Sequence, residues 1–375
     1  MRALSIGVSG GGVGGLAAAL ALSRAGHEVA VFEQSAAYGR VGADVNLTPN
    51  AVRALDGLGI GAALRATAAR PTHRISRTWD TGEETSRLEM ADAAEERYGA
   101  PQLTIHRADL LTALQGGLDG RVVRFGQRVA AIDHGATHAT LVLTDGTRHQ
   151  VDALIGADGI HSGVRAALFG PDAPRFTGLV AYRAVVARRL LSIPNLDAFT
   201  KWWGPTPSVQ IVTFPLNRGA ETFFFATLPQ DDWLHESWTM RGDLAELRAA
   251  YAGFHPEARA LLDACTEVMK SALYVRDPMP EWSAGRVSLL GDACHPMVPF
   301  MAQGACMAIE DAVVLGRALE GVEPADVPAA LQRYEGARRP RTARVQENSL
   351  GNEWLKQGGN ADWVYGYDAW TAPLV

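Results

Sequence analysis

Three glycines near the start of the chain have the spacing of a loop that binds a dinucleotide. Gly10, Gly12 and Gly15 form a G-x-G-x-x-G pattern between the apolar residues 3–8 and the Ala- and Leu-rich residues 16–25. This order predicts a strand, a tight turn and a helix whose N-terminus faces the phosphates of the ligand. The turn also contains Val13 and Gly14.

A carboxylate follows at a distance that strengthens this interpretation. Residues 28–32 predict a second strand, and Glu33 at its end lies 23 residues beyond Gly10. A carboxylate there can accept a hydrogen bond from a ribose hydroxyl, which favours a 2′-hydroxyl over a 2′-phosphate. We therefore expect FAD or NAD, and the motif does not choose between them. A glycine-rich loop alone would more often be a plain turn.

Two further acids stand where apolar segments end. Asp158 lies between Gly156 and Gly159, and Asp292 follows the apolar residues 286–290. Glycines on both sides let the backbone approach a ligand while the acid offers an acceptor. The alternative for Asp158 is an ordinary cap before the next helix. After Asp292, the segment from Gln303 to Ala312 predicts a helix whose start can face a ligand anion.

Composition bounds the class of protein. The 375 residues carry a formal net charge of −6, which opposes a broad nucleic-acid footprint, and the basic residues 338–344 are interpreted as a solvated helix face. No apolar run reaches the ~18 residues of a membrane span. Cys265, Cys294 and Cys306 fit no disulfide framework or metal site. We expect a cytoplasmic protein without membrane, nucleic-acid or metal partners.

The middle of the chain predicts a sheet. Residues 179–186, 209–214 and 222–228 are rich in β-branched and aromatic residues, and residues 217–219 form a hairpin signal. The predicted fold class is α/β: a Rossmann-like dinucleotide-binding domain with an inserted antiparallel β-sheet domain and C-terminal helices. The aromatic tail at 363–370 is expected to pack on its own body or in a dimer contact, which leaves a monomer or a homodimer open.

The three motifs, in this order, resemble the class A flavoprotein monooxygenases, the family of p-hydroxybenzoate hydroxylase. The resemblance covers nearly the whole chain and is most specific at residues 104–107, 201–203, 291–297, 302–311 and 363–368. Within that family the chain resembles the 6-hydroxynicotinate, salicylate and 3-hydroxybenzoate hydroxylases. It implies tightly bound FAD, NADH or NADPH as a transient co-substrate, and hydroxylation of a small aromatic or pyridine ring by O2 through a flavin C4a-hydroperoxide.

The resemblance also implies a division of the chain and a set of cofactor contacts. Residues 1–70, 101–175 and 273–345 would bind FAD, residues 71–100 would form a substrate-side insertion, 176–272 the substrate sheet, and 346–375 a C-terminal helix and tail. The implied cofactor-binding residues are Gly10, Gly12, Val13, Gly14, Gly15, Glu33, Gln34, Arg40, Arg107, Val129, Asp158, Asp292, Pro299, Gly304 and Ala305.

The expected substrate site departs from those relatives. Asn46 stands where the 6-hydroxynicotinate enzyme has a histidine base, Thr213 where it has a catalytic tyrosine, and Phe300 where it has another pocket histidine. Asn46 cannot accept a proton at neutral pH, so either the substrate differs or the proton goes elsewhere. The candidate catalytic residues are Asn46, Gln210 and Thr213, and the candidate substrate walls are Trp202, Phe214 and Phe300.

Three rival functions remain in view. An NAD-dependent dehydrogenase would not need the motifs around Asp158 and Asp292. A different reaction on the same fold, such as halogenation, would need a W-x-W-x-I-P signature that the sequence lacks. A flavin-based sensor could keep the FAD motifs and lose the pocket base, as the residues at 46 and 213 would allow.

Overall fold

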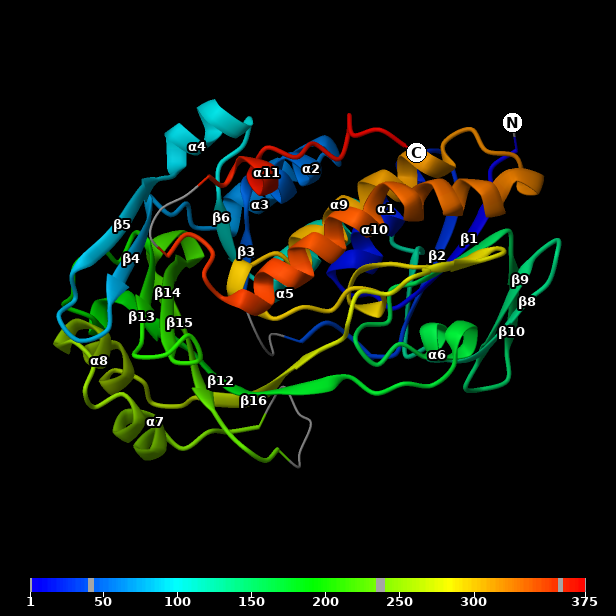
Figure 1. The fold of residues 1–375 in the computed structure, drawn as a ribbon. Coiled ribbons are helices and arrows are strands. Elements are labelled where there is room, and N and C mark those ends of the chain that lie inside the picture. Colours follow the sequence, from blue (N-terminus) through cyan, green and yellow to red (C-terminus); the bar gives the residue numbers. More distant parts are fainter. Residues whose placement is uncertain (1, 40–43, 234–239, 357–359, 375) are drawn as a thin grey trace.

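The glycine motif belongs to a six-stranded sheet at the centre of one half of the molecule, seen at the right of Figure 1. The computed structural model describes residues 2–39, 44–233, 240–356 and 360–374. The strand order is β17-β18-β11-β1-β2-β7, and every pair except β17–β18 is parallel. The strands are β1 (Ser5–Ser9), β2 (Glu28–Glu33), β7 (Val123–Phe125), β11 (Ala153–Gly156), β17 (Ser283–Ala284) and β18 (Val287–Leu289).

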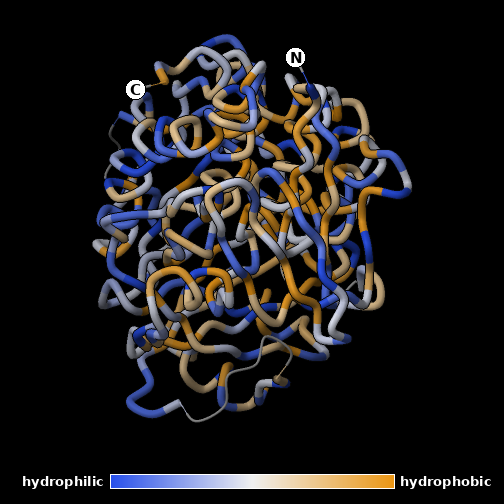
Figure 2. The backbone as a smooth tube through the Cα atoms, turned by 90° about the vertical axis from the view of Figure 1, so that its right-hand side faces the viewer, coloured by the Kyte–Doolittle hydropathy of each residue, from blue (hydrophilic) through white to orange (hydrophobic). Residues whose placement is uncertain are grey.

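Helices cover this sheet because their apolar faces need burial. Helix α1 (Val13–Arg24) packs against α9 (Gly304–Leu319), which in turn packs against the long α10 (Val327–Gly351). The other helices are α2 (Pro49–Gly57), α3 (Gly61–Thr67), α4 (Ala91–Tyr98), α5 (Arg107–Gly116), α6 (Gly163–Phe169), α7 (Leu244–Ala250), α8 (Pro256–Asp263) and α11 (Asp362–Tyr365). In Figure 2 hydrophobic stretches run through the interior, while many outer loops are hydrophilic.

A seven-stranded sheet forms the other half, at the left of Figure 1, with α7 and α8 on its outer face. Its order is β16-β12-β15-β14-β13-β4-β5. The strands are β4 (His73–Thr78), β5 (Glu84–Glu89), β12 (Arg175–Ala187), β13 (Phe199–Trp203), β14 (Gln210–Leu216), β15 (Glu221–Pro229) and β16 (Met269–Val275). The sheet is antiparallel except where β13 runs parallel to β4. The predicted inserted sheet is therefore present, with this one parallel pair.

Two small sheets complete the fold. Strand β3 (Asp44–Leu47) pairs with β6 (Leu103–His106), and β8 (Val129–His134), β9 (Ala139–Leu143) and β10 (Arg148–Val151) form a three-stranded sheet. The hairpin predicted at 217–219 joins β14 to β15 through a short turn, Asn217–Gly219. The division of the chain into six segments stays a prediction.

The interpretation of residues 338–344 as a solvated helix face was wrong for Arg338 and Arg341. Arg338 is fully buried and forms ion pairs with Glu310 and Asp311 of α9, and Arg341 pairs with Glu310. Arg344, which is exposed, lies over the ring of Trp363. The basic cluster is thus mainly the partner of a buried acidic pair, because α10 lies directly on α9.

Among the described residues no helix is long and apolar enough to cross a membrane. The three cysteines are free and buried. Trp370 donates to the carbonyl of Ala54, and Tyr365 is fully buried against the ring of Tyr98, so the aromatic tail packs on its own body.

Candidate active site

A first cavity of about 460 Å³ opens at the carboxyl ends of β1 and β2, where the glycine motif lies. Its walls include the turn from Gly10 to Gly12 and the start of α1. No side chain caps α1, so the first N–H groups of that helix can bond to an anion. Further lining residues are Glu33, Gln34, Tyr38, Arg107, Val129, Asp158 and His161.

The glycines fit a ligand that needs close backbone approach. Gly10 has φ +101°, and a Cβ there would lie 2.4 Å from the carbonyl oxygen of Ala157. A Cβ on Gly15 would lie 1.9 Å from the carbonyl oxygen of Gly10, so the third glycine allows the helix to pack on the turn. Val13 and Gly14 do not line the cavity, and Gly14 packs against Leu290 and Ala308. Arg40 lies outside the described residues.

Two predicted acids also organise the backbone around this cavity. The Glu33 carboxylate accepts bonds from the N–H groups of Gly11 and Ser35, both at 2.7 Å. Each carboxylate oxygen keeps further acceptor capacity for a sugar hydroxyl. Asp158 accepts from the N–H of Val164 at 3.1 Å and from the hydroxyl of Ser162, which caps α6. Both sequence interpretations of Asp158 are thus compatible with the structure.

A second cavity of about 290 Å³ lies between the seven-stranded sheet and the segment that precedes α9. His161 lines both cavities. A ligand with a phosphate end and a ring end can therefore lie with one end in each. Asp292, Pro299, Gly304 and Ala305 line this second cavity, as do Asn46, Gln210, Phe214 and Phe300.

One wall of the second cavity combines aromatic rings with buried cations. Phe199 and Phe214 stack with centroids 5.5 Å apart and planes inclined by 6°. The Arg74 guanidinium lies over the Phe199 ring, 4.8 Å from its centroid. The Nζ of Lys201 lies 3.6 Å from the centroid of Trp203 and donates to Asn352 at 2.7 Å. Burial lowers the pKa of Lys201 well below its usual value, and the nearby Arg74 lowers it further.

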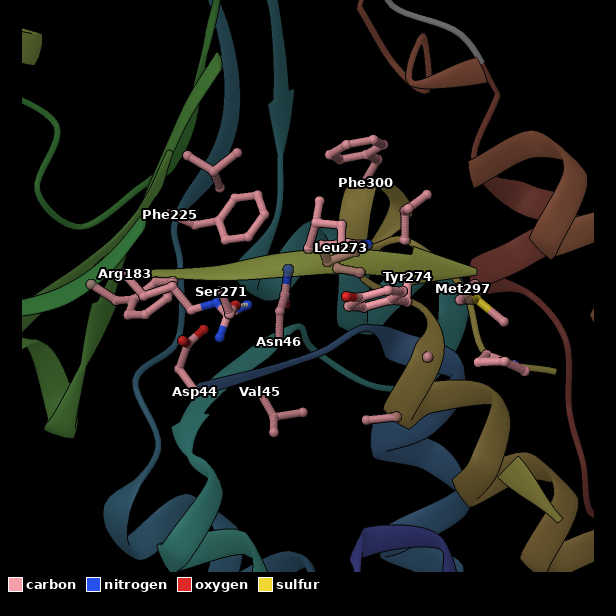
Figure 3. A pocket seen from close by; sticks show the side chains of 18 of the residues that line it. Asp44, Val45, Asn46, Arg183, Phe225, Ser271, Leu273, Tyr274, Met297 and Phe300 are labelled. Carbon is pink, nitrogen blue, oxygen red and sulfur yellow. Dashed lines mark hydrogen bonds between the residues drawn. The ribbon is translucent and has the colours of Figure 1, made fainter. Parts of the chain in front are cut away.

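A carboxylate and an amide from β3 line the cavity as well, and a guanidinium from β12 lies near them (Figure 3), on the same face of the seven-stranded sheet as Lys201. Asp44 and Asn46 come from β3, and Arg183 donates to the hydroxyl of Ser271 at 2.7 Å. Asn46 accepts from Gln102 at 2.7 Å, and its own Nδ2 has no partner among the described residues. Burial raises the pKa of Asp44 to about 8, although Arg183 acts to lower it.

The structure does not bring Trp202 and Thr213 into this cavity. Alternate residues of a strand face opposite sides of the sheet, and Phe199 and Lys201 take the cavity side of β13. Trp202 is therefore on the outer side, where it stacks on His255 and lies under Arg77. Thr213 pairs with Thr200 on that same side. The predicted contacts of Trp202 and Thr213 with the substrate are therefore not supported, because neither residue lines the cavity.

Sequence reasoning missed the charged residues of the cavity. Arg74, Arg183 and Lys201 line it, and none was a candidate. Arg183 is the one charged residue of the predicted strand 179–186, and Lys201 is the one charged residue of Phe199-Thr200-Lys201-Trp202-Trp203. A buried strand rarely carries a charged side chain without a function, so this pattern is the signal that could have identified these two residues.

Comparisons with known proteins agree with this geometry. A family model described as FAD binding domain matches residues 4–349. The chain is 40% identical over 373 residues to the 6-hydroxynicotinate 3-monooxygenase of Bordetella bronchiseptica, covering 99% of this chain and 97% of that protein. It is 37% identical over 384 residues to the 3-amino-4-hydroxybenzoate 2-monooxygenase PtmB3 of Streptomyces platensis, covering 97% and 96%.

A solved structure shows the same fold. A salicylate hydroxylase in complex with its substrate superposes with a TM-score of 0.84 at 27% identity, covering 98% of this chain and 96% of the other. Family model, relatives and fold agree over nearly the full length. The chain therefore belongs to the FAD binding domain family, within its group of FAD-dependent aromatic monooxygenases.

Proposed function

We propose that this protein hydroxylates a small aromatic or pyridine ring that carries a hydroxyl group and a carboxylate. FAD would be the bound cofactor, and NADH or NADPH and O2 the co-substrates. The observation that carries the proposal is the second cavity, which shares the lining residue His161 with the first and combines aromatic walls with buried cations. The relatives named above act on rings of this kind.

The cationic wall supports an anionic group on the substrate. Lys201 and Arg74 lie on adjacent strands, and Lys201 is 2% exposed. An ammonium group in such a place is costly unless an opposite charge accompanies it. A bound carboxylate would therefore restore the charged form of Lys201 and gain a charge-assisted hydrogen bond. This would orient the ring along the cavity.

The apolar walls would hold the ring and exclude water. Phe214 packs on Phe199 and on Phe223, whose centroid lies 4.9 Å from its own, and Phe300 closes another side. Aromatic rings of this kind prefer offset or edge contacts with a flat ligand. A dry site also prevents side reactions with solvent.

The residues around α9 and α1 fit the cofactor. The glycine turn and Arg107 would hold the pyrophosphate, and Gly304 and Ala305 at the start of α9 would face the ring system with helix N–H groups. When bound, FAD would supply electron transfer from the nicotinamide and the activation of O2. The protein residues would bind, orient and desolvate the substrate. We place this activity in the cytoplasm, as the free buried cysteines support.

The test is aerobic oxidation of NADH and NADPH by the purified FAD-loaded protein, with product analysis. The rings are 6-hydroxynicotinate, 3-amino-4-hydroxybenzoate, 3-hydroxybenzoate and salicylate. We expect at least one ring to accelerate oxidation and to yield a hydroxylated product. In Lys201→Met the KM for that ring should rise by about tenfold or more, as expected for a lost charged contact, whereas Arg259→Met, exposed on α8 and outside the cavity lining, should match wild type.

Two results would contradict the proposal and favour its alternatives. Acceleration that yields only peroxide with every ring would indicate an FAD-binding oxidoreductase that does not hydroxylate. Ring binding with no acceleration at all would indicate a flavin-based sensor.

A further inference from the structure

We propose that Asp44 is the proton acceptor for the ring hydroxyl of the substrate, a role that rests on the proposed function. Hydroxylation of a ring is easier when its hydroxyl has lost the proton, because the anion is richer in electrons at the ortho and para carbons. A protein that catalyses this step needs a base within hydrogen-bond reach. A group that lines the second cavity must therefore be able to accept that proton.

The position of Asp44 meets the geometric requirement. Asp44 is the first residue of β3 and lines the second cavity beside Asn46, as Figure 3 shows. Its Oδ1 is shielded from solvent and has no hydrogen-bond partner among the described residues. A buried carboxylate oxygen without a donor is costly for a protein to keep. A ligand that donates a hydrogen bond would satisfy it.

Among the other titratable groups that line the cavity, the lysine, the histidine, the second aspartate and the arginines are less suited to this role. Lys201 already donates to Asn352, and its place among the aromatic rings fits an anion. His161 lies at the junction with the first cavity, where the cofactor would pass. Asp292 stands in the segment that precedes α9, on the expected flavin side. Arginine stays protonated in proteins.

Neighbouring groups would stabilise the products of the transfer. The Arg183 guanidinium on β12 acts to lower the pKa of Asp44, and it donates a hydrogen bond to Ser271 of β16. His106, which faces Asp44 across the β3–β6 pair, is bonded through its ring to Glu221. The Nδ2 of Asn46, which has no partner among the described residues, would donate to the ring oxygen once that oxygen is negative. With a pKa of about 8, Asp44 is a carboxylate able to accept a proton above that pH and a protonated acid below it.

The step balances without another reactant. The O–H bond of the ring hydroxyl breaks, its electron pair stays on the ring oxygen, and the proton forms a bond with Oδ1 of Asp44. The carboxyl group returns the proton to solvent after the product leaves. The outcome is a ring anion held between the two walls of the cavity, with its carboxylate at Lys201.

The test compares wild type, Asp44→Asn and Asp44→Glu as FAD-loaded full chains, with Asp133→Asn on the exposed side of β8 as the control. The substrate is the most active ring of the panel above, and product formation is followed from pH 6 to pH 10.5. At pH 8 we expect Asp44→Asn to lose about a hundredfold in kcat or more. The Asp44→Glu variant should recover part of the rate, and Asp133→Asn should match wild type.

The pH profile separates a base from a merely structural carboxylate. A free phenolic hydroxyl ionises near pH 10, so the deficit of Asp44→Asn should shrink above that pH, where the ring arrives as its anion. A deficit that is the same at every pH, or full activity at pH 8, would overturn the role of Asp44. FAD content, read from flavin absorbance, should be equal in all four proteins. Failure of wild type to hydroxylate any ring would instead overturn the proposed function, and this inference with it.

Discussion

The ionisation of one residue, Asp44, should be visible in the stability of the whole protein. Burial raises its pKa from 3.8 to about 8. Between these values the folded state holds a proton that the unfolded state has lost. The stabilising contribution is therefore complete below about pH 4 and disappears as the pH rises to about 8.

We expect Asp44→Asn to remove this dependence. The amide does not ionise, so the difference in melting temperature between wild type and variant should change in favour of the variant as the pH rises from 5 to 8.5. Differential scanning calorimetry of the FAD-loaded proteins measures this, with Asp133→Asn as the control because residue 133 is exposed. Parallel melting curves for wild type and Asp44→Asn across this range would show that the carboxyl group is not perturbed.

The positions of the expected cofactor residues depend on less of the fold than those of the residues around the second cavity. Gly10, Gly15 and Glu33 follow a fixed spacing along one strand-turn-helix-strand unit, so their positions depend on few contacts. Lys201 and Arg183 reach the second cavity only through pairing of strands far apart in the chain. No spacing rule reports such pairings. The lone charge in each strand was the available signal.

At the scale of elements, α9 and α10 are joined by a buried charged cluster. Arg338 of α10 pairs with Glu310 and Asp311 of α9, all fully buried, and Asp311 also bonds to His295. Burial opposes ionisation of Glu310, but Arg341 and Arg338 nonetheless hold its pKa below the usual value. Asn50 of α2 donates to the same carboxylate at 2.7 Å. The cluster therefore holds the middle of α9 against α10 and α2.

We expect Arg338→Ala to destabilise the protein by about 3 kcal/mol or more, because it leaves two buried carboxylates short of a partner. Arg339→Ala on the same helix is the matched control. Arg339 forms only a half-exposed ion pair with Glu335, and its loss should cost less than about 1 kcal/mol. Urea unfolding of both variants measures the difference. Equal losses would show that the buried cluster contributes no more than the surface pair.

The sequence predicts where these strands lie along the chain better than it predicts which side of each strand faces the cavity. The aromatic and β-branched runs identify β12, β14 and β15, and the turn at Asn217–Gly219 identifies the hairpin that joins β14 to β15. Which side of each strand faces the ligand depends on where the rest of the molecule packs. Helices α7 and α8 bury one side of the sheet, and this places Trp202 and Thr213 away from the cavity. Tertiary packing, which a strand's own sequence does not contain, makes that choice.

At the scale of the whole molecule, the function depends on two halves meeting. The first cavity belongs to the six-stranded sheet, and the second is closed by the seven-stranded sheet, β3 and the start of α9. The two share His161. A cofactor that spans both cavities would form part of the wall of the second, so substrate binding and cofactor binding should be coupled.

This coupling predicts that an aromatic acid binds well only when FAD is present. Benzoate is a suitable probe, because it has the carboxylate for Lys201 and lacks a hydroxyl that could react. Titration calorimetry should give a benzoate Kd at least about tenfold weaker for the FAD-free protein, and added FAD should restore the affinity. By linkage, saturating benzoate should tighten FAD binding by the same factor. Equal benzoate affinity with and without FAD would mean that the second cavity is complete on its own, and that the two halves bind their ligands independently.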